Sequence, residues 1–171
     1  MHDAIRIRVL GPADLDQFRA MRSTGLTSDP EAFATGETAW QEASEEAVRQ
    51  LLARSGTADA VILGASDPNL TGVVGVRREG KANTRHKAAV WGLYVPVEQR
   101  GRGIGRALVQ SAVSHARALP DLRMLRISVA ASSEIALRLF EAEGFQVYGR
   151  EPDGRRTPEG YCDVVYLYLS L

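Results

Sequence analysis

This sequence has one cysteine, no formal net charge and no long apolar run. Its single cysteine, Cys162, excludes an internal disulfide framework and fits a reducing compartment. A formal net charge of zero argues against a general affinity for nucleic acid or for anionic membranes. No apolar run approaches the roughly 20 residues that span a bilayer, and Arg6 and Arg8 interrupt the apolar N-terminus, unlike a secretory signal. We therefore expect a cytoplasmic protein whose partners are neither nucleic acid nor membrane.

Histidine is also scarce. The three histidines, His2, His86 and His115, lack the spacing of metal ligands, so no metal site is predicted. The remaining composition is that of an ordinary globular protein, with 44% hydrophobic and 25% charged residues. A length of 171 residues suffices for one domain with its own core, and we expect a single domain over residues 1–171.

Hydrophobic periodicity predicts an α/β fold with a mixed central sheet of about seven strands flanked by about four helices. In the first predicted helix Leu15, Phe18, Met21 and Arg22 lie on related faces. Turn-like connections predict antiparallel pairing among the early strands, and long helices predict crossovers among the later ones. We expect strands at 5–9, 60–63, 70–77, 87–95, 125–129, 145–148 and 164–169. We expect four helices: one opened by the turn at 11–14 and running to about residue 25, one from 45 to about 54, one at 104–119, and one capped by Ser132 or Ser133 and ending just before Gly144.

The most informative segment runs from Gln99 to Arg106, between a predicted strand and a predicted helix. Its three glycines, Gly101, Gly103 and Gly105, leave backbone N–H groups open to close approach by a ligand. The first turn of the following helix adds unpaired N–H groups and the positive end of the helix dipole. This arrangement predicts a site for a phosphate-bearing ligand.

Three arginines strengthen this prediction, because Arg100, Arg102 and Arg106 add positive charge with no acid among them. Together with the glycines they indicate a pyrophosphate. The dinucleotide fingerprint is excluded, since Arg106 stands where it requires a glycine. The nucleotide P-loop is excluded because Arg106-Ala107 follows Gly105 in place of Lys-Ser/Thr. A plain connecting turn is the alternative, and the alternating arginines argue against it.

With this element order and the motif Arg100-x-Arg102-Gly103-x-Gly105, the chain resembles the GNAT superfamily of acetyl-CoA-dependent N-acetyltransferases. Residues 93–108 are similar to the family's acetyl-CoA motif. Residues 133–145 are similar to its second motif, and residues 28–33 and 160–163 also match. The resemblance covers nearly the whole chain and implies the family's fold and activity.

The resemblance also implies where acetyl-CoA binds. The backbone of the fourth strand would hold the pantetheine and the acetyl group, the glycine-rich turn would wrap the diphosphate, and the helix of the second motif would border the pantetheine. A bulge ahead of Pro96, with free N–H groups near Val95, would stabilise the oxyanion. The implied cofactor-binding residues are Leu93, Tyr94, Val95, Arg100, Gly101, Arg102, Gly103, Ile104, Gly105, Arg106, Ser133, Ala136 and Phe140.

Three positions depart from the family pattern. Ser133 replaces a common asparagine, and Phe140 replaces the tyrosine that usually serves as general acid. Ala89 lies near the position of the glutamate base of histone-type members. The catalytic residues therefore stay unassigned.

Other side chains are candidates for the missing proton transfers. Glu31, Glu37 and Glu79 lie on segments that border the acceptor cleft in this fold, although each also fits a solvated surface acid. Tyr94 and Tyr161 are candidates to replace the tyrosine acid, with packing as the alternative role. Since a free thiol has a pKa of about 8.5, a CoA thiolate can leave without an acid.

The sequence says least about the acceptor substrate of the predicted acetyl transfer. Phe33 and Trp40 follow the first predicted helix and Trp91 lies on the cofactor strand, so these three are candidate substrate residues, with core packing as the alternative. The partner is expected to be a small-molecule amine or an amine of a peptide or protein. The Tyr- and Leu-rich final strand would allow pairing across a homodimer.

The sequence thus predicts direct transfer of an acetyl group from acetyl-CoA to a primary amine through a tetrahedral intermediate. Two other functions stay open. One is a non-catalytic acyl-CoA-binding or sensor protein on the same fold, which the missing asparagine, tyrosine and glutamate would explain. The other is a nucleotide-binding protein that uses the glycine-rich turn for a different phosphate.

Overall fold

The computed structural model describes residues 5–33 and 37–171, without the side chains of Glu37 and Thr38. Its strands form one seven-stranded sheet, as predicted, and the outermost pairings are β1 with β2 and β7 with β6. The strands are β1 (Arg6–Val9), β2 (Ala60–Asp67), β3 (Asn69–Arg78), β4 (Lys87–Tyr94), β5 (Met124–Ala130), β6 (Gln146–Thr157) and β7 (Gly160–Ser170), in the order β1-β2-β3-β4-β5-β7-β6.

Five α-helices occur within the described ranges 5–33 and 37–171, one more than predicted. The extra helix, α2, has five residues, and so short a segment carries too little periodicity to be recognised in the sequence. Short 3₁₀ turns, η1 (Pro12–Asp14), η2 (Pro30–Ala32) and η3 (Val97–Gln99), join several of the elements. The helices are α1 (Leu15–Ser28), α2 (Glu37–Gln41), α3 (Glu45–Ala53), α4 (Ile104–Arg117) and α5 (Glu134–Ala142).

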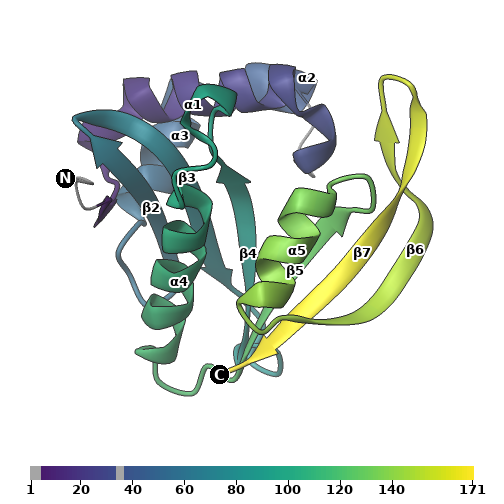
Figure 1. Cartoon of the computed structure of the whole chain (residues 1–171). Helices are drawn as coiled ribbons and strands as arrows, with labels where there is room; N and C mark the ends of the chain where they lie inside the picture. Colours follow the sequence, from purple (N-terminus) through teal and green to yellow (C-terminus); the bar gives the residue numbers. More distant parts are fainter. Residues whose placement is uncertain (1–4, 34–36) are drawn as a thin grey trace.

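The helices cover both faces of the sheet, so the central strands are buried on both sides. Helices α4 and α5 pack on one face and lie in front of the sheet in Figure 1, whereas α1, α2 and α3 pack on the other. In β2, Val61 and Leu63 belong to the core under α4 and α5, and Ile62 between them belongs to the core under α1 to α3. Burial on both faces explains why β2 reads as a continuous apolar run.

Only β4 and β5 run parallel, and every other neighbouring pair of strands is antiparallel. Helix α4 makes the crossover that a parallel pair requires. It approaches the sheet closely at Gly72 of β3, where a Cβ atom would lie 2.9 Å from the side chain of Leu108. The fold therefore holds the start of α4 tightly against the sheet, next to the end of β4.

The hairpin of β6 and β7 forms the sheet's other margin and extends away from the helices (Figure 1). Strand β7 is paired with β5 on one side and with β6 on the other. Residues 164–168, within the stretch expected to allow pairing across a homodimer, are therefore paired on both sides and offer no free edge for it. The edge strand at this side of the sheet is β6.

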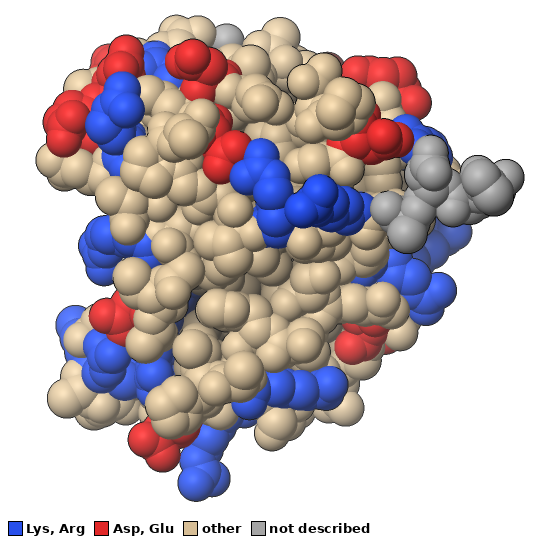
Figure 2. Space-filling model, turned by 90° about the vertical axis from the view of Figure 1, so that its left-hand side faces the viewer, with Lys and Arg blue, Asp and Glu red and all other residues tan. Residues whose placement is uncertain are grey.

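Charge is mixed on the face shown in Figure 2, where basic and acidic side chains are interspersed. No helix in the described part of the chain is long and apolar enough to cross a membrane. Within residues 5–33 and 37–171 there is also no group of three or more His, Cys, Asp or Glu side chains that could hold a metal ion.

Candidate functional site

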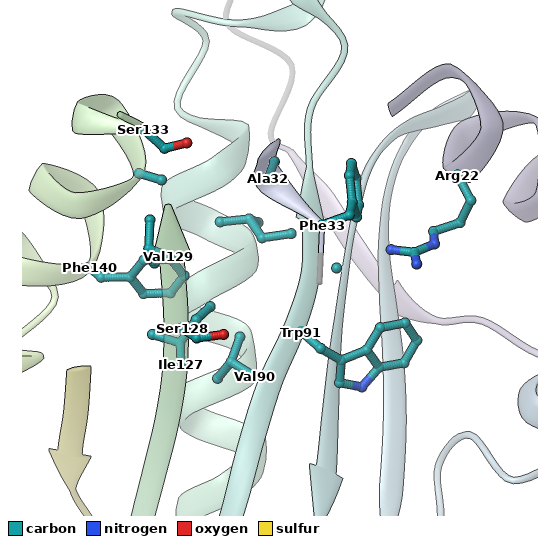
Figure 3. Close-up of a pocket in the computed structure, with 13 residues that line it drawn as sticks. Arg22, Ala32, Phe33, Val90, Trp91, Ile127, Ser128, Val129, Ser133 and Phe140 are labelled. Atoms are coloured by element: carbon teal, nitrogen blue, oxygen red, sulfur yellow. The ribbon is translucent and has the colours of Figure 1, made fainter. Parts of the chain in front are cut away.

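Strands β4 and β5 pair over only part of their length, and a cavity opens between them where the pairing ends. Their parallel pairing comprises three positions, from Lys87 opposite Met124 to Ala89 opposite Arg126. Beyond Ala89 the two strands no longer pair, and both line a cavity of about 120 Å³ (Figure 3). Residues of α5 close one side of this cavity, and residues of α1 and of the η2 segment close the other.

A β-bulge in β4 lies at the edge of the cavity. Strand β4 pairs with β3 at Trp91 and at Tyr94, and between these positions it has one residue more than β3. Gly92, within the bulge, adopts a positive φ of 62° and lines the cavity. A bulge leaves backbone groups outside the ladder. The sequence predicts such a bulge nearer to Val95, ahead of Pro96, and the structure places it at Gly92 instead.

The glycine-rich loop ends in an uncapped helix. Gly101 and Gly103 take positive φ values of 78° and 80°, and Gly103 is the N-cap of α4 without a side-chain cap. The first backbone N–H of the helix that donates to a protein acceptor belongs to Ala107, and its acceptor is the carbonyl of Gly103 at 3.0 Å. Among the described residues, no backbone N–H from Gly101 to Arg106 donates to a protein acceptor. Such a row of free donors at a helix N-terminus suits an anion.

The three loop arginines are not free charges. Each forms an ion pair with an acid far away in the sequence, and their side chains are 40 to 58% exposed. The Arg102–Asp67 pair, which is exposed at both partners, is screened by solvent and contributes little. The pairs are Arg100 with Asp29 at 2.7 Å, Arg102 with Asp67 at 3.3 Å and Arg106 with Glu143 at 2.6 Å.

Arg100 has a second contact that links the loop to β4. Its Nε donates to the carbonyl of Val95 at 2.9 Å, while its other end holds Asp29 at the end of α1. The hydrogen bond from Arg106 lowers the pKa of the Glu143 carboxyl below its usual value. The arginine side chains therefore brace the loop against neighbouring elements, and the loop's backbone supplies the unpaired donors.

On the opposite side of the cavity lies a buried arginine, Arg22 of α1, with 4% of its surface exposed. Its guanidinium lies over the rings of Phe33, Trp40 and Trp91, at 4.6, 5.2 and 5.7 Å from their centroids. Burial lowers the pKa of Arg22 to about 10, so the side chain is still charged at neutral pH. Its Nε has no hydrogen-bond partner, and no described residue forms an ion pair with it.

The backbone of β4 is shaped to accept Arg22. A Cβ atom at Gly92 would lie 2.9 Å from the Nη1 atom of Arg22. Trp91 lies flat over β3 because Gly75 has no side chain; a Cβ there would lie 2.1 Å from the indole ring. Figure 3 shows the Arg22 guanidinium pointing between Phe33 and Trp91 toward β4.

The structure brings many of the predicted site residues together. Six of them line the cavity: Leu93, Ser133, Ala136, Phe140, Phe33 and Trp91. Tyr94 lies outside this lining, with its ring buried and its hydroxyl 2.9 Å from that of Ser28. Trp40 lies behind Arg22, outside the lining, and its Nε1 donates to the hydroxyl of Ser23 at 3.2 Å. Phe140 packs edge-on against Phe145 at 5.2 Å.

None of the candidate acid–base residues lines the cavity among the described side chains. The carboxylate of Glu31 accepts a hydrogen bond from Ser132, and that of Glu79 accepts one from Arg126. The side chain of Glu37 lies outside the described residues. Tyr161 is 66% exposed on β7. The described lining contains no Asp, Glu, His, Lys or Tyr, and its polar side chains are those of Arg22, Trp91, Ser128 and Ser133.

Sequence reasoning missed Arg22 as a site residue, although a signal for it was present. The spacing of Leu15, Phe18 and Arg22 places the arginine on the buried face of α1. A charged residue on such a face is rarely buried without a role or a partner. Gly92 and Ser128 were missed as well, and no pattern in the sequence distinguishes either of them.

Comparisons with known proteins agree with one another. The model of the acetyltransferase (GNAT) family matches residues 26–145. No curated protein matches the chain.

Solved structures share the fold over nearly the whole chain. A GNAT-family acetyltransferase from Streptococcus pneumoniae has a TM-score of 0.87 at 20% identity, covering 98% of this chain and 100% of its own. The GCN5-related N-acetyltransferase from Kribbella flavida has a TM-score of 0.79 at 26% identity and covers 100% of both chains. YncA from Salmonella typhimurium, solved with its cofactor acetyl-CoA, has a TM-score of 0.86 at 16% identity, covering 99% of this chain and 95% of its own.

Proposed function

The chain belongs to the GNAT acetyltransferase family, and on that basis we propose that it transfers an acetyl group from acetyl-CoA to a primary amine. The proposal rests on the cavity between β4 and β5 together with the uncapped start of α4. None of residues 94–106 lines the cavity, but the start of α4 packs at Gly105 against α5, the helix that closes one side of it. The free N–H groups at the start of the crossover helix suit the phosphate end of a long ligand, and the gap between the two strands suits its other end.

The cofactor would lie along the parted strands. Its diphosphate would accept hydrogen bonds from the backbone N–H groups of residues 101–106, which lack protein acceptors. Its pantetheine would run along residues 93–95 of the chain, opposite Ser133, Ala136 and Phe140 of the second motif. Gly105 suits this path, because a Cβ there would lie 3.4 Å from Leu139 of α5 and narrow the gap between the helices.

The thioester would then lie at the bulge of β4. There the amine nitrogen attacks the thioester carbonyl carbon, and a tetrahedral oxyanion forms. Backbone N–H groups that the bulge at Gly92 removes from the ladder are placed to stabilise this oxyanion. The carbon–sulfur bond breaks, the CoA thiolate leaves, and the amide nitrogen loses its proton to water.

Proton transfer by a side chain is not part of this proposal. Phe140 has no proton to donate, and the hydroxyl of Tyr94 is engaged with Ser28. A CoA thiolate, with a pKa of about 8.5 for its conjugate thiol, can leave without an acid. We propose that positioning and the backbone dipoles supply the acceleration, and that the amine reacts from its neutral form.

One observation favours a second candidate function, a non-catalytic acyl-CoA-binding or sensor protein. It is the lack of any Asp, Glu, His, Lys or Tyr side chain in the described cavity lining. A nucleotide-binding function has no such support. One domain over residues 1–171 and a cytoplasmic location stay predictions, and so do the absence of nucleic-acid and membrane partners and a homodimer.

Two measurements separate these functions. Calorimetric titration with acetyl-CoA, CoA and ATP is expected to show binding of the first two and none of ATP. Thiol release from acetyl-CoA across a panel of primary amines is expected to show turnover with at least one amine. Binding without turnover of any amine would support the sensor, and preferential binding of ATP would refute both CoA-based functions.

A further inference from the structure

The acceptor side of the cavity contains a charge that no described residue neutralises. Arg22 is 4% exposed, lines the cavity, and forms no ion pair with any residue in the described part of the chain. Its Nε is buried without a hydrogen-bond partner. Its guanidinium lies over the aromatic rings of Phe33, Trp40 and Trp91 and close to the backbone of Gly92.

Burial of an arginine in this way is unusual, because a buried charge is costly unless it is paired and hydrogen-bonded. Aromatic faces offset part of this cost but accept no strong hydrogen bond from the fork of donors. The described lining contains no carboxylate that could turn toward the guanidinium. With no described acid paired with Arg22, we expect a ligand anion as its partner, and a carboxylate matches the guanidinium fork best.

The position of Arg22 relates this anion to the reaction. Its Nη1 would lie 2.9 Å from a Cβ on Gly92, the residue of the β4 bulge where the thioester is proposed to lie. A carboxylate on Arg22 would thus lie close to the reacting carbonyl. An acceptor that reaches both points needs its amine and its carboxylate separated by only a few bonds.

Resting on the proposed function, we propose that Arg22 binds the carboxylate of a small amino-acid acceptor, whose amine it directs to the thioester at Gly92. Arg22 is therefore a specificity-determining residue. The same charge disfavours polyamines and lysine side chains, since like charges repel strongly at a buried site. It also favours the neutral, reactive form of the acceptor's amine.

The test is thiol release from acetyl-CoA with alanine, serine and methionine, each compared with its α-carboxamide and its decarboxylated amine. The wild-type protein is expected to prefer each amino acid over its carboxamide by at least about tenfold in kcat/KM. In Arg22→Met this preference is expected to disappear, mainly because KM for the amino acids rises. In Arg22→Lys the preference is expected to lie between those of the wild type and Arg22→Met. Arg19→Met, which changes a half-exposed arginine of the same helix outside the cavity, is the matched control.

Stability separates a binding role from a structural one. Loss of an unpaired buried charge is expected to leave the Tm of Arg22→Met equal to or above that of the wild type. If Arg22 had a structural role, its replacement would instead lower the Tm. Affinity for CoA, measured by calorimetry, is expected to stay within about twofold of wild type, so that failure of cofactor binding is distinguished from failure of the acceptor site.

A binding measurement keeps the proposal testable if no amine is turned over. The chain has two tryptophans, Trp40 and Trp91, and both lie within 6 Å of the Arg22 guanidinium. Titration of the CoA complex with the same amino acids is expected to change their fluorescence in the wild type and not in Arg22→Met. Equal use of amino acids and their carboxamides by the wild type, or an unchanged preference in Arg22→Met, would overturn the proposal. Equal fluorescence responses of the two proteins would overturn it as well.

Discussion

The two sides of the cavity handle positive charge in opposite ways. On the cofactor side, Arg100, Arg102 and Arg106 are 40 to 58% exposed, and each is paired with an acid. On the acceptor side, Arg22 is 4% exposed and unpaired among the described residues. The cluster of arginines in the sequence therefore draws attention to the loop, whereas the buried arginine without a described counter-ion, Arg22, lies on the other side of the cavity.

The comparison shows that different parts of the chain supply the two anion sites. Around the loop the free donors are backbone N–H groups of residues 101–106. A side-chain substitution leaves these groups in place and affects them only by altering the loop's conformation. Around Arg22 the donor is a single side chain. We therefore expect the cofactor side to tolerate loss of an arginine and to be sensitive to a new negative charge.

The largest effect is expected from a negative charge at the N-cap of α4. Gly103→Asp and Gly103→Asn impose the same backbone strain at a φ of 80° and differ only in charge. We expect acetyl-CoA to bind the Asp variant roughly ten- to a hundredfold more weakly than the Asn variant, because the carboxylate competes with the diphosphate. Calorimetric titration of both variants measures the difference. Equal affinities would show that the diphosphate is bound elsewhere.

On the acceptor side, Gly75→Ala displaces Trp91, since the new Cβ would lie 2.1 Å from the indole ring. We expect a loss of roughly 1–3 kcal/mol in the free energy of unfolding, together with a shift in tryptophan emission. Gly80→Ala is the matched control, because a Cβ at Gly80 meets nothing within 4 Å. An unchanged stability of Gly75→Ala would mean that Trp91 does not pack over β3.

Phe140→Tyr adds a hydroxyl at the position where the resemblance to the family leads us to expect a tyrosine. Phe140 is 1% exposed, packs against Phe145 and lines the cavity. We expect turnover to be retained and stability to fall by about 1 kcal/mol, because the added hydroxyl has few partners there. Steady-state kinetics and chemical denaturation measure the two effects. A steep loss of kcat would show that the packing of the unmodified ring is needed for the reaction.

A smaller effect is expected from Arg102→Gln. The guanidinium of Arg102 is about half exposed and already paired with Asp67 and bonded to Gln99. We expect the Kd for acetyl-CoA to rise by less than about fivefold, and the rise to disappear at high salt. Calorimetry at two ionic strengths checks this result. A loss as large as that of Gly103→Asp would mean that arginine side chains, and not the backbone, hold the diphosphate.

The smallest effect concerns His115 of α4, a second ionisable group with a buried nitrogen that lacks a partner. Burial lowers its pKa, so the unfolded chain binds more protons than the folded one once the pH falls through about 6.5. His115 therefore destabilises the fold at acid pH. We expect the Tm difference between about pH 7.5 and about pH 5.5 to be smaller in His115→Gln than in the wild type. An identical difference would contradict this sign.

Much of the fold could be predicted because it follows from local patterns. The seven strands and four of the five helices have a visible period or cap, and Pro96 and Gly144 end their elements as expected. Helix α2 was missed because it is barely longer than one turn. The position of the β4 bulge was misplaced because it depends on pairing with β3, where Gly75 accommodates Trp91.

The site was only partly predictable for a related reason. The glycine pattern identifies the loop locally, but the acid partners of its arginines come from elements that are distant in the sequence. The parting of β4 and β5 depends on how few positions the two strands share, which no local pattern reveals. Arg22 is visible in the sequence on the apolar face of its helix, yet only the folded structure shows that no described acid pairs with it.

A crystal structure of the complex with acetyl-CoA tests the central claim most directly. We predict diphosphate oxygens within hydrogen-bond distance of the backbone N–H groups of residues 101–106, and the thioester carbonyl at the bulge of Gly92, facing Arg22. A diphosphate held elsewhere, or a thioester on the far side of β5 from Arg22, would contradict the account.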